Sequence, residues 1–184
     1  EESSAASDVY KRQTKDIVLI GLFIALGLIL PMVFHQLGEN MARMFSPIHI
    51  PALIAGALMG PIHGLLVGVL TVLTSSLITS MPQFPYAFVM MVECGSYGLF
   101  SGLFQKMLTK DAIGTFVSTA LAMVAGRIVY GFAQYVFMLT ISKPYSVSAW
   151  VTSMFVKGLP AIILHIILVP IVILLLRKYV RDFD

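Results

Sequence analysis

Apolar runs separated by short polar or turn-forming stretches make up most of the chain. The runs cover residues 17–34, 47–60, 62–78, 84–104, 112–139 and 150–177. A helix needs about 20 apolar residues to cross the hydrocarbon core of a bilayer, and most of the runs are close to that length. The pairs Gly60-Pro61 and Met81-Pro82 are turn signals between runs. The pattern predicts an all-α integral membrane bundle of about six transmembrane helices.

The domain organisation follows from the same pattern. The second run is short and meets the third at Gly60-Pro61 almost without a linker. We expect these two runs to form a close helical hairpin, or the second to be tilted or interrupted. The polar residues 1–13 show no apolar period, and we expect them to lie outside the fold, either disordered or an artefact of cloning or sequencing. A single membrane domain is then predicted for residues 14–181.

The composition excludes several classes of protein. Apolar residues make up 58% of the chain and charged residues 11%, whereas soluble domains carry about 25% charged residues. The apolar runs use up the length, so a nucleotide-binding domain has no room and any ATP use would need another subunit. We find no nucleophile–base pair and no phosphate-binding loop, and we expect no catalytic residue, metal or cofactor. Cys94 is the single cysteine and is expected to be a core thiol.

The basic residues between the runs indicate the orientation. One side of the bundle collects Lys11, Arg12, Lys15, Lys106, Lys110, Arg177, Lys178 and Arg181, and the other side only Arg43 and Lys143. Cytoplasmic loops carry the excess of Lys and Arg. Both termini are therefore predicted to be cytoplasmic, with the loops 35–46, 80–85 and 140–149 outside. Basic residues at helix ends do not form a nucleic-acid-binding patch, and we expect a multi-pass protein of the plasma membrane.

Three charged residues stand out inside the apolar runs: Glu93, Arg127 and Lys157. A charge at membrane depth costs at least about 2.5 kcal/mol on insertion scales, so each needs an explanation. At about 1.5 Å per residue, their distances from the outer end of each run are roughly 14, 18 and 10 Å. The similar depths predict one outward-opening polar cavity. A Glu93–Arg127 salt bridge that only fastens two helices is the structural alternative.

Aromatic and amide residues accompany each charge at helical spacing and complete the candidate substrate site. Tyr86 and Tyr97 share a face with Glu93, Tyr130 and Gln134 with Arg127, and Trp150 and Ser153 with Lys157. Asn40, Arg43 and His49 are expected at the outer mouth of the cavity. Two cations and one carboxylate suit an anionic ligand. The histidines are scattered and lack metal-site spacing.

Small residues recur at helix-packing spacing. Gly21 and Ala25 make a small-xxx-small pair on the first run, and a longer track runs through Ala55, Gly56, Gly60, Gly64 and Gly68. Such residues let helix backbones approach closely in lipid. The track indicates packing within the chain, and Gly21 with Ala25 could instead form a docking face for another membrane subunit.

Three motifs carry a resemblance to a known family. They are Ser46-Pro47-Ile48-His49-Ile50-Pro51-Ala52-Leu53-Ile54-Ala55-Gly56, Gly60-Pro61-Ile62-His63-Gly64 and Gly126-Arg127-Ile128-Val129-Tyr130-Gly131. With the helix pattern, they resemble the substrate-binding S components of energy-coupling factor (ECF) vitamin transporters, in the branch of pantothenate, hydroxymethylpyrimidine and cobalamin carriers. The likeness covers about residues 14–181.

The resemblance implies a vitamin-capture subunit that docks on a membrane coupling subunit driven by two cytoplasmic ATPases. The docking motif of the family is Ala-x-x-x-Ala, here with Gly21 in the first position and Ala25 in the second. The resemblance also implies that Arg127 and Lys157 hold an anionic group and that Glu93 accepts hydrogen bonds. Tyr86, Tyr130 and Trp150 would supply stacking surface.

Pantothenate fits this charge balance best, an aminopyrimidine paired with Glu93 is the second choice, and cobalamin would need a wider mouth. A stand-alone ion-coupled secondary transporter and a non-transporting scaffold are the alternatives. Secondary transporters usually contain internal repeats, and none is evident between the two halves of the chain.

Overall fold

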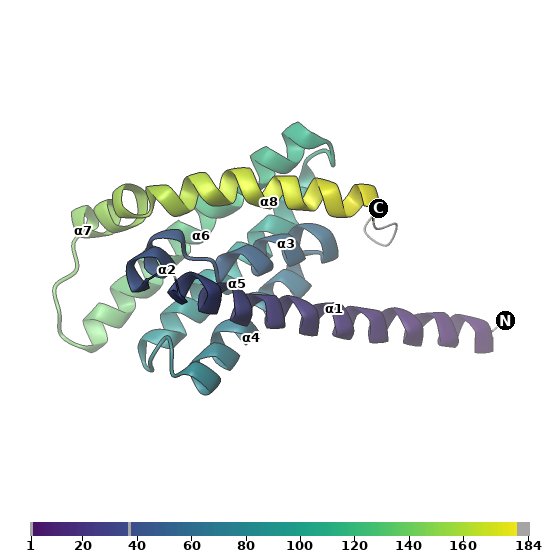
Figure 1. The fold of residues 1–184 in the computed structure, drawn as a ribbon, viewed down its shortest axis with the longest axis horizontal. Coiled ribbons are helices and arrows are strands. Elements are labelled where there is room, and N and C mark those ends of the chain that lie inside the picture. The colour runs from purple at the N-terminus through teal and green to yellow at the C-terminus, as the bar shows by residue number, and fades with distance from the viewer. Residues whose placement is uncertain (1, 37, 180–184) are drawn as a thin grey trace.

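The computed structural model describes residues 2–36 and 38–179. The structured elements within these ranges are all helical, which confirms the expected all-α class. The helices are α1 (Glu2–Gln36), α2 (Glu39–Phe45), α3 (His49–Met59), α4 (Pro61–Thr79), α5 (Tyr86–Met107), α6 (Ala112–Thr140), α7 (Val147–Val151), the π-helical turn η1 (Thr152–Lys157) and α8 (Leu159–Tyr179) (Figure 1).

Five helices of the described residues are long and apolar enough to cross a membrane. They are Gln13–Gln36, Pro61–Thr79, Tyr86–Met107, Ala112–Thr140 and Leu159–Tyr179. The expected second span is α3, which has 11 residues and therefore reaches only about 16 Å. One residue, Gly60 (φ 101°), separates it from α4. The tight hairpin is confirmed, and α3 is too short to span alone.

The last apolar run is not one helix, contrary to the expected span over residues 150–177. It is divided into α7, the π-turn η1 and α8, with Gly158 between the last two. Pro160 explains the break, because proline has no N–H to bond to a preceding turn and suits the first turn of a new helix. The residues before Gly158 are thereby free to fold over the outer part of α6.

Helix α5 lies at the centre of the bundle and packs against α3, α4 and α6. Helix α1 covers α3 and α4, and α8 covers α3 and α6. In Figure 1 the start of α1 and the end of α8 both lie on the right, while the turns after α2, α4 and α6 lie on the left. The two ends of the described chain are therefore at the same end of the bundle, as the predicted orientation requires.

Glycines allow α5 to touch its neighbours through the backbone. A Cβ on Gly98 would overlap the backbone of Gly64, and one on Gly68 would overlap the backbone of Cys94. A Cβ on Gly56 would meet the carbonyl of Gly98. The small-residue track of the second and third runs therefore packs within the chain, whereas a Cβ on Gly21 would meet nothing within 4 Å.

Helix α1 begins at Glu2, where no ordered structure was expected. Its apolar part starts at Gln13. No proline or glycine occurs in residues 2–12 to stop a helix, so the polar segment continues the same helix backwards. The boundary of the membrane domain at residue 14 stays a prediction.

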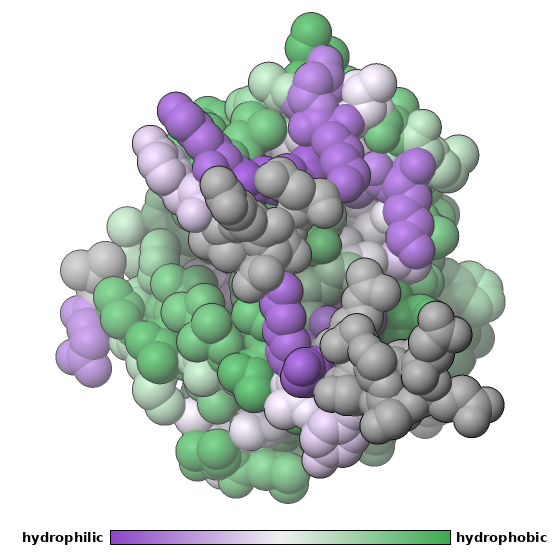
Figure 2. All heavy atoms as spheres, turned by 90° about the vertical axis from the view of Figure 1, so that its right-hand side faces the viewer, coloured by the Kyte–Doolittle hydropathy of each residue, from purple (hydrophilic) through white to green (hydrophobic). Residues whose placement is uncertain are grey.

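Hydrophilic side chains gather at the end of the molecule that holds the start of α1 and the end of α8, beside large apolar areas (Figure 2). Lys106, Lys110 and Lys178 are exposed. Arg177 ties this end together, because its guanidinium donates to the carbonyl of Ala57 at 3.1 Å and that of Lys110 at 3.3 Å. The basic end is the one predicted to face the cytoplasm.

Asp111 caps the start of α6 at this basic end. Its Oδ1 accepts the backbone N–H of Gly114 at 2.9 Å and the hydroxyl of Thr109. The Thr109 hydroxyl, followed by the Gly114 N–H, lowers the pKa of Asp111 below its ordinary value of 3.8, because both donors favour the charged carboxylate. The cap satisfies one of the N–H groups that a helix start leaves without partners.

We expect Asp111→Ala to lower the thermal midpoint of the purified protein at pH 7, because the helix start loses its acceptor. When folding lowers the pKa of a group, that group stabilises the folded state at pH values above its unfolded-state pKa. The difference between wild type and variant should therefore shrink as the pH falls below about 4. Asp111→Asn is the matched control: its side-chain oxygen keeps the cap, so its midpoint should stay near that of the wild type. A midpoint unchanged in Asp111→Ala would contradict the role of the cap.

Candidate functional site

The Glu93 carboxylate is buried at the centre of the bundle on α5. Tyr97, one turn further along α5, donates its hydroxyl to Glu93 Oε1 at 3.3 Å. His49 of α3 places its Nε2 3.8 Å from Glu93 Oε2 and its ring edge-on to the Tyr97 ring, with centroids 4.9 Å apart. Three of the predicted site residues, Glu93, Tyr97 and His49, therefore meet in one cluster.

His165 joins this cluster from α8, and the sequence reasoning did not select it. It is 1% exposed, and its ring stands perpendicular to that of His49, with centroids 5.9 Å apart. The signal in the sequence is a polar side chain in the middle of a strongly apolar helix. Such residues are rare inside membranes and usually have a function. Within the described residues, these histidines and the nearby carboxylate form no group suited to a metal ion.

Arg127 lies buried on α6, where Gly126 beside it packs against the Tyr97 ring. Its Nη1 donates to the backbone carbonyl of Met154 in η1 and lies 3.7 Å from the Met154 sulfur. Trp150 in α7 donates its indole N–H to the Arg127 carbonyl at 3.3 Å. The segment before α8 therefore holds Arg127 at both its backbone and its side chain.

Glu93 and Arg127 form no ion pair in the part of the chain that the structure describes, so the structural alternative, a Glu93–Arg127 salt bridge that fastens two helices, is not formed. The His49 imidazole lies 3.8 Å from the Glu93 carboxylate. Arg127 donates through Nη1 to a backbone carbonyl, while its Nε has no partner among the described residues. Arg127 is still close enough to interact electrostatically with Glu93 and with His49. The two charges thus face a shared region without neutralising each other directly.

An outer tier of polar side chains continues from Arg127 along α6. Tyr130 and Tyr86 share a hydrogen bond between their hydroxyls at 3.1 Å, which joins α6 to the start of α5. Gln134 is buried one turn further out. Positions 127, 130 and 134 follow the helical repeat, as the sequence predicted, and span about 10 Å along the helix.

The remaining predicted residues lie elsewhere or cannot be placed. Trp150 packs against Gly131 and lines a cavity of about 260 Å³ on the flank of α6, together with Tyr135 and Tyr145. Ser153 is half-buried in η1, and Asn40 is exposed on α2. The side chains of Arg43 and Lys157 lie outside what the structure describes. The structure therefore leaves the role proposed for Lys157 untested.

Four polar atoms in this region are buried without a hydrogen-bond partner among the described residues. They are His49 Nε2, His165 Nε2, Arg127 Nε and Gln134 Oε1. Each unsatisfied buried polar atom costs about 1–3 kcal/mol, so four such atoms on three neighbouring helices destabilise a cluster that has a structural role alone. A polar ligand that supplies both donors and acceptors would complete these bonds.

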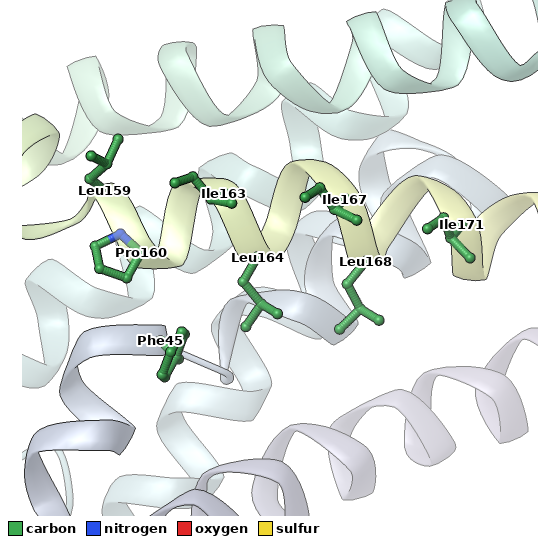
Figure 3. A pocket seen from close by; sticks show the side chains of 8 residues that line it. All are labelled: Phe45, Leu159, Pro160, Ile163, Leu164, Ile167, Leu168 and Ile171. Atoms are coloured by element: carbon green, nitrogen blue, oxygen red, sulfur yellow. The ribbon is translucent and has the colours of Figure 1, made fainter.

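A larger cavity, of about 470 Å³, is lined by none of the polar residues of the cluster. Phe45 of α2 and the apolar residues of α8 from Leu159 to Ile171 line it, and Figure 3 shows Leu164 and Leu168 pointing into the space below α8. All of its lining side chains are apolar. Recognition of a polar solute needs precisely placed polar groups, so the polar cluster, rather than this cavity, is the candidate site.

Membrane-length helices around a buried polar cluster define a multi-pass membrane protein that binds a small solute. The family model of the ECF transporter, substrate-specific component, matches residues 15–173. The chain therefore belongs to this family, and it is a transport protein of the plasma membrane rather than an enzyme. Membership implies a small-molecule substrate and association with an ECF module. No characterised protein and no solved structure shows significant similarity to the chain.

Proposed function

We propose that this chain captures a B-type vitamin or vitamin precursor from outside the cell, with pantothenate as the favoured ligand. The observation that supports this most is the set of unsatisfied polar atoms beside Glu93 and Arg127, buried in the bundle. A small solute with hydrogen-bonding groups at both ends would satisfy atoms that otherwise remain without partners.

Pantothenate offers a carboxylate at one end and two hydroxyls at the other, with an amide between them. In the proposal its carboxylate accepts from the guanidinium of Arg127, whose Nε has no partner among the described residues. Charge-assisted bonds of this kind are the strong ones. Glu93 then accepts hydrogen bonds from the two hydroxyls, and His49 accepts from them or donates to them.

A neutral aminopyrimidine is the second candidate, and one observation favours it. The Glu93 carboxylate lies beside the His49 imidazole, with Oε2 and Nε2 3.8 Å apart. A carboxylate next to a ring nitrogen complements an exocyclic amine next to a heterocyclic nitrogen. Such a ligand has no anionic group, so its binding would depend much less on Arg127.

The coupling partner is proposed to dock on α1. Gly21 and Ala25 are exposed, while Phe23 and Gly27 of the same helix are buried, and a Cβ on Gly27 would overlap Thr71. One face of α1 is thus used inside the chain, and the small-residue face is left for another helix. The proposed partner is the membrane coupling subunit, which two cytoplasmic ATPases drive.

Calorimetric titration of the detergent-purified protein against pantothenate, an aminopyrimidine and the other B vitamins tests the proposal. Tight binding of one compound supports capture, and binding of none would reject it in favour of a scaffold. Uptake by the purified chain alone in ATP-free vesicles, driven by an ion gradient, would instead support a secondary transporter. Binding without such uptake is the expected combination.

A further inference from the structure

His49 stands beside Glu93 without bonding to it directly, and His165 stands beside His49. The His49 Nε2 to Glu93 Oε2 distance is 3.8 Å, which is longer than a hydrogen bond. The two imidazole rings are perpendicular, with centroids 5.9 Å apart. Both histidines are more than nine-tenths buried, and the Nε2 atom of each has no partner in the described chain. Three helices therefore bring three polar side chains together and leave their hydrogen-bonding capacity unused.

The surroundings of His165 determine which of its nitrogens can accept. Its ring lies within hydrogen-bonding reach of the backbone at Phe45 and Ser46, in the turn between α2 and α3. Since Nε2 has no partner, the nitrogen that faces this backbone is Nδ1. Backbone carbonyls only accept, so Nδ1 carries the proton. A neutral imidazole with a protonated Nδ1 presents a lone pair at Nε2, and His165 is thereby assigned as an acceptor.

Glu93 from α5 and His165 from α8 each lie next to His49, so two acceptor groups flank the same cluster from different helices. A ligand group that carries two neighbouring donors complements them, whereas a group that only accepts would leave both without partners. We infer that His165, with His49 and Glu93, selects the donor-rich end of the ligand, such as the two hydroxyls of pantothenate. This inference rests on the proposed function, and it makes His165 a specificity residue.

Two probes and two variants test it. The probes are pantothenate and its analogue in which both hydroxyls are replaced by hydrogen. In His165→Asn the amide nitrogen takes the place of Nδ1 and the Nε2 acceptor is lost, whereas in His165→Gln the amide reaches the Nε2 position. By calorimetry, wild type should prefer pantothenate over the analogue. His165→Asn should reduce that preference about tenfold or more, by weakening pantothenate alone. His165→Gln should reduce it less.

Other outcomes separate the possible failures. Equal weakening of both probes in His165→Asn, with a lowered thermal midpoint, would assign His165 a structural role and overturn the inference. An unchanged preference in both variants would overturn it too. If His165→Asn does not fold, His165→Leu decides, because leucine suits the apolar helix α8 and carries no lone pair. A wild-type preference in His165→Leu contradicts selection through the Nε2 lone pair. Failure of the wild type to bind pantothenate rejects the proposed ligand itself, which is a different result.

Discussion

Replacing Arg127 by alanine is expected to weaken pantothenate binding by about a hundredfold or more. The guanidinium is buried on α6 beside Glu93, and its Nε has no partner among the described residues. Removing one member of a buried, hydrogen-bonded charge pair costs about 2–5 kcal/mol, and each 1.4 kcal/mol is a factor of ten in affinity. Calorimetric titration of the purified variant measures the loss.

The control for this prediction must separate charge recognition from folding, because Arg127 also bonds to the carbonyl of Met154. Lys143→Ala removes an exposed cation from the loop after α6 and should leave binding unchanged. Pantothenyl alcohol, in which a hydroxymethyl group replaces the carboxylate, should bind the Arg127→Ala variant nearly as well as it binds the wild type. Wild-type affinity for pantothenate in Arg127→Ala would show that the anionic group binds elsewhere.

The aminopyrimidine candidate gives the opposite result in the same measurement. A neutral heterocycle that binds through Glu93 and His49 would lose little affinity in Arg127→Ala and much in Glu93→Leu, because leucine removes the acceptor for its amine. The two variants measured together therefore distinguish the ligands by charge, even before the vitamin has been identified.

Much of the fold could be predicted from apolar length and turn signals. The spans in α4, α5 and α6 differ from the predicted runs by only a few residues, because a membrane helix must be apolar over its whole length. The break before α8 was not predicted, although the helix-breaking residues Gly158 and Pro160 stand there with only Leu159 between them. Apolar run length carries no information on such a break, since every residue on both sides suits a membrane.

The depth of the polar residues was predictable, but their partners were not. Counting residues along each helix placed Glu93 and Arg127 at similar depth, and the structure puts both in one region. Which side chains bond depends on helix rotation and on the path of neighbouring segments. Arg127 therefore turned out to bond to a backbone carbonyl of η1, and Glu93 to lie beside His49.

His165 illustrates the limit of reading each helix alone. Its position in α8 gives its depth but not its partners, and the ring that it contacts, His49, belongs to α3, more than a hundred residues earlier in the chain. The helix that carries His49 is too short to span, so its place between α1 and α8 is set by packing rather than by the bilayer. Such a contact follows only from the assembled bundle.

The coupling partner can be tested apart from the ligand with Ala25→Trp. Ala25 is exposed on α1, and one turn earlier a Cβ on Gly21 would meet nothing within 4 Å. An indole at position 25 would therefore leave the interior of the chain undisturbed and would prevent a second helix from approaching closely. We expect vitamin binding to be unchanged and ATP-driven uptake, in vesicles that contain the coupling subunit and ATPases, to be abolished.

The matched control for Ala25→Trp is Val124→Trp, which adds the same bulk at an exposed position of α6 (Val124 is 48% exposed). Its uptake and its binding should both stay at the wild-type level, because lipid rather than a helix is expected to cover that face. If uptake survives in Ala25→Trp as well, the docking face lies elsewhere on the bundle. If uptake and binding are lost together, the indole has disturbed the packing of α1 on α4, and the small-residue face belongs to the fold rather than to a partner.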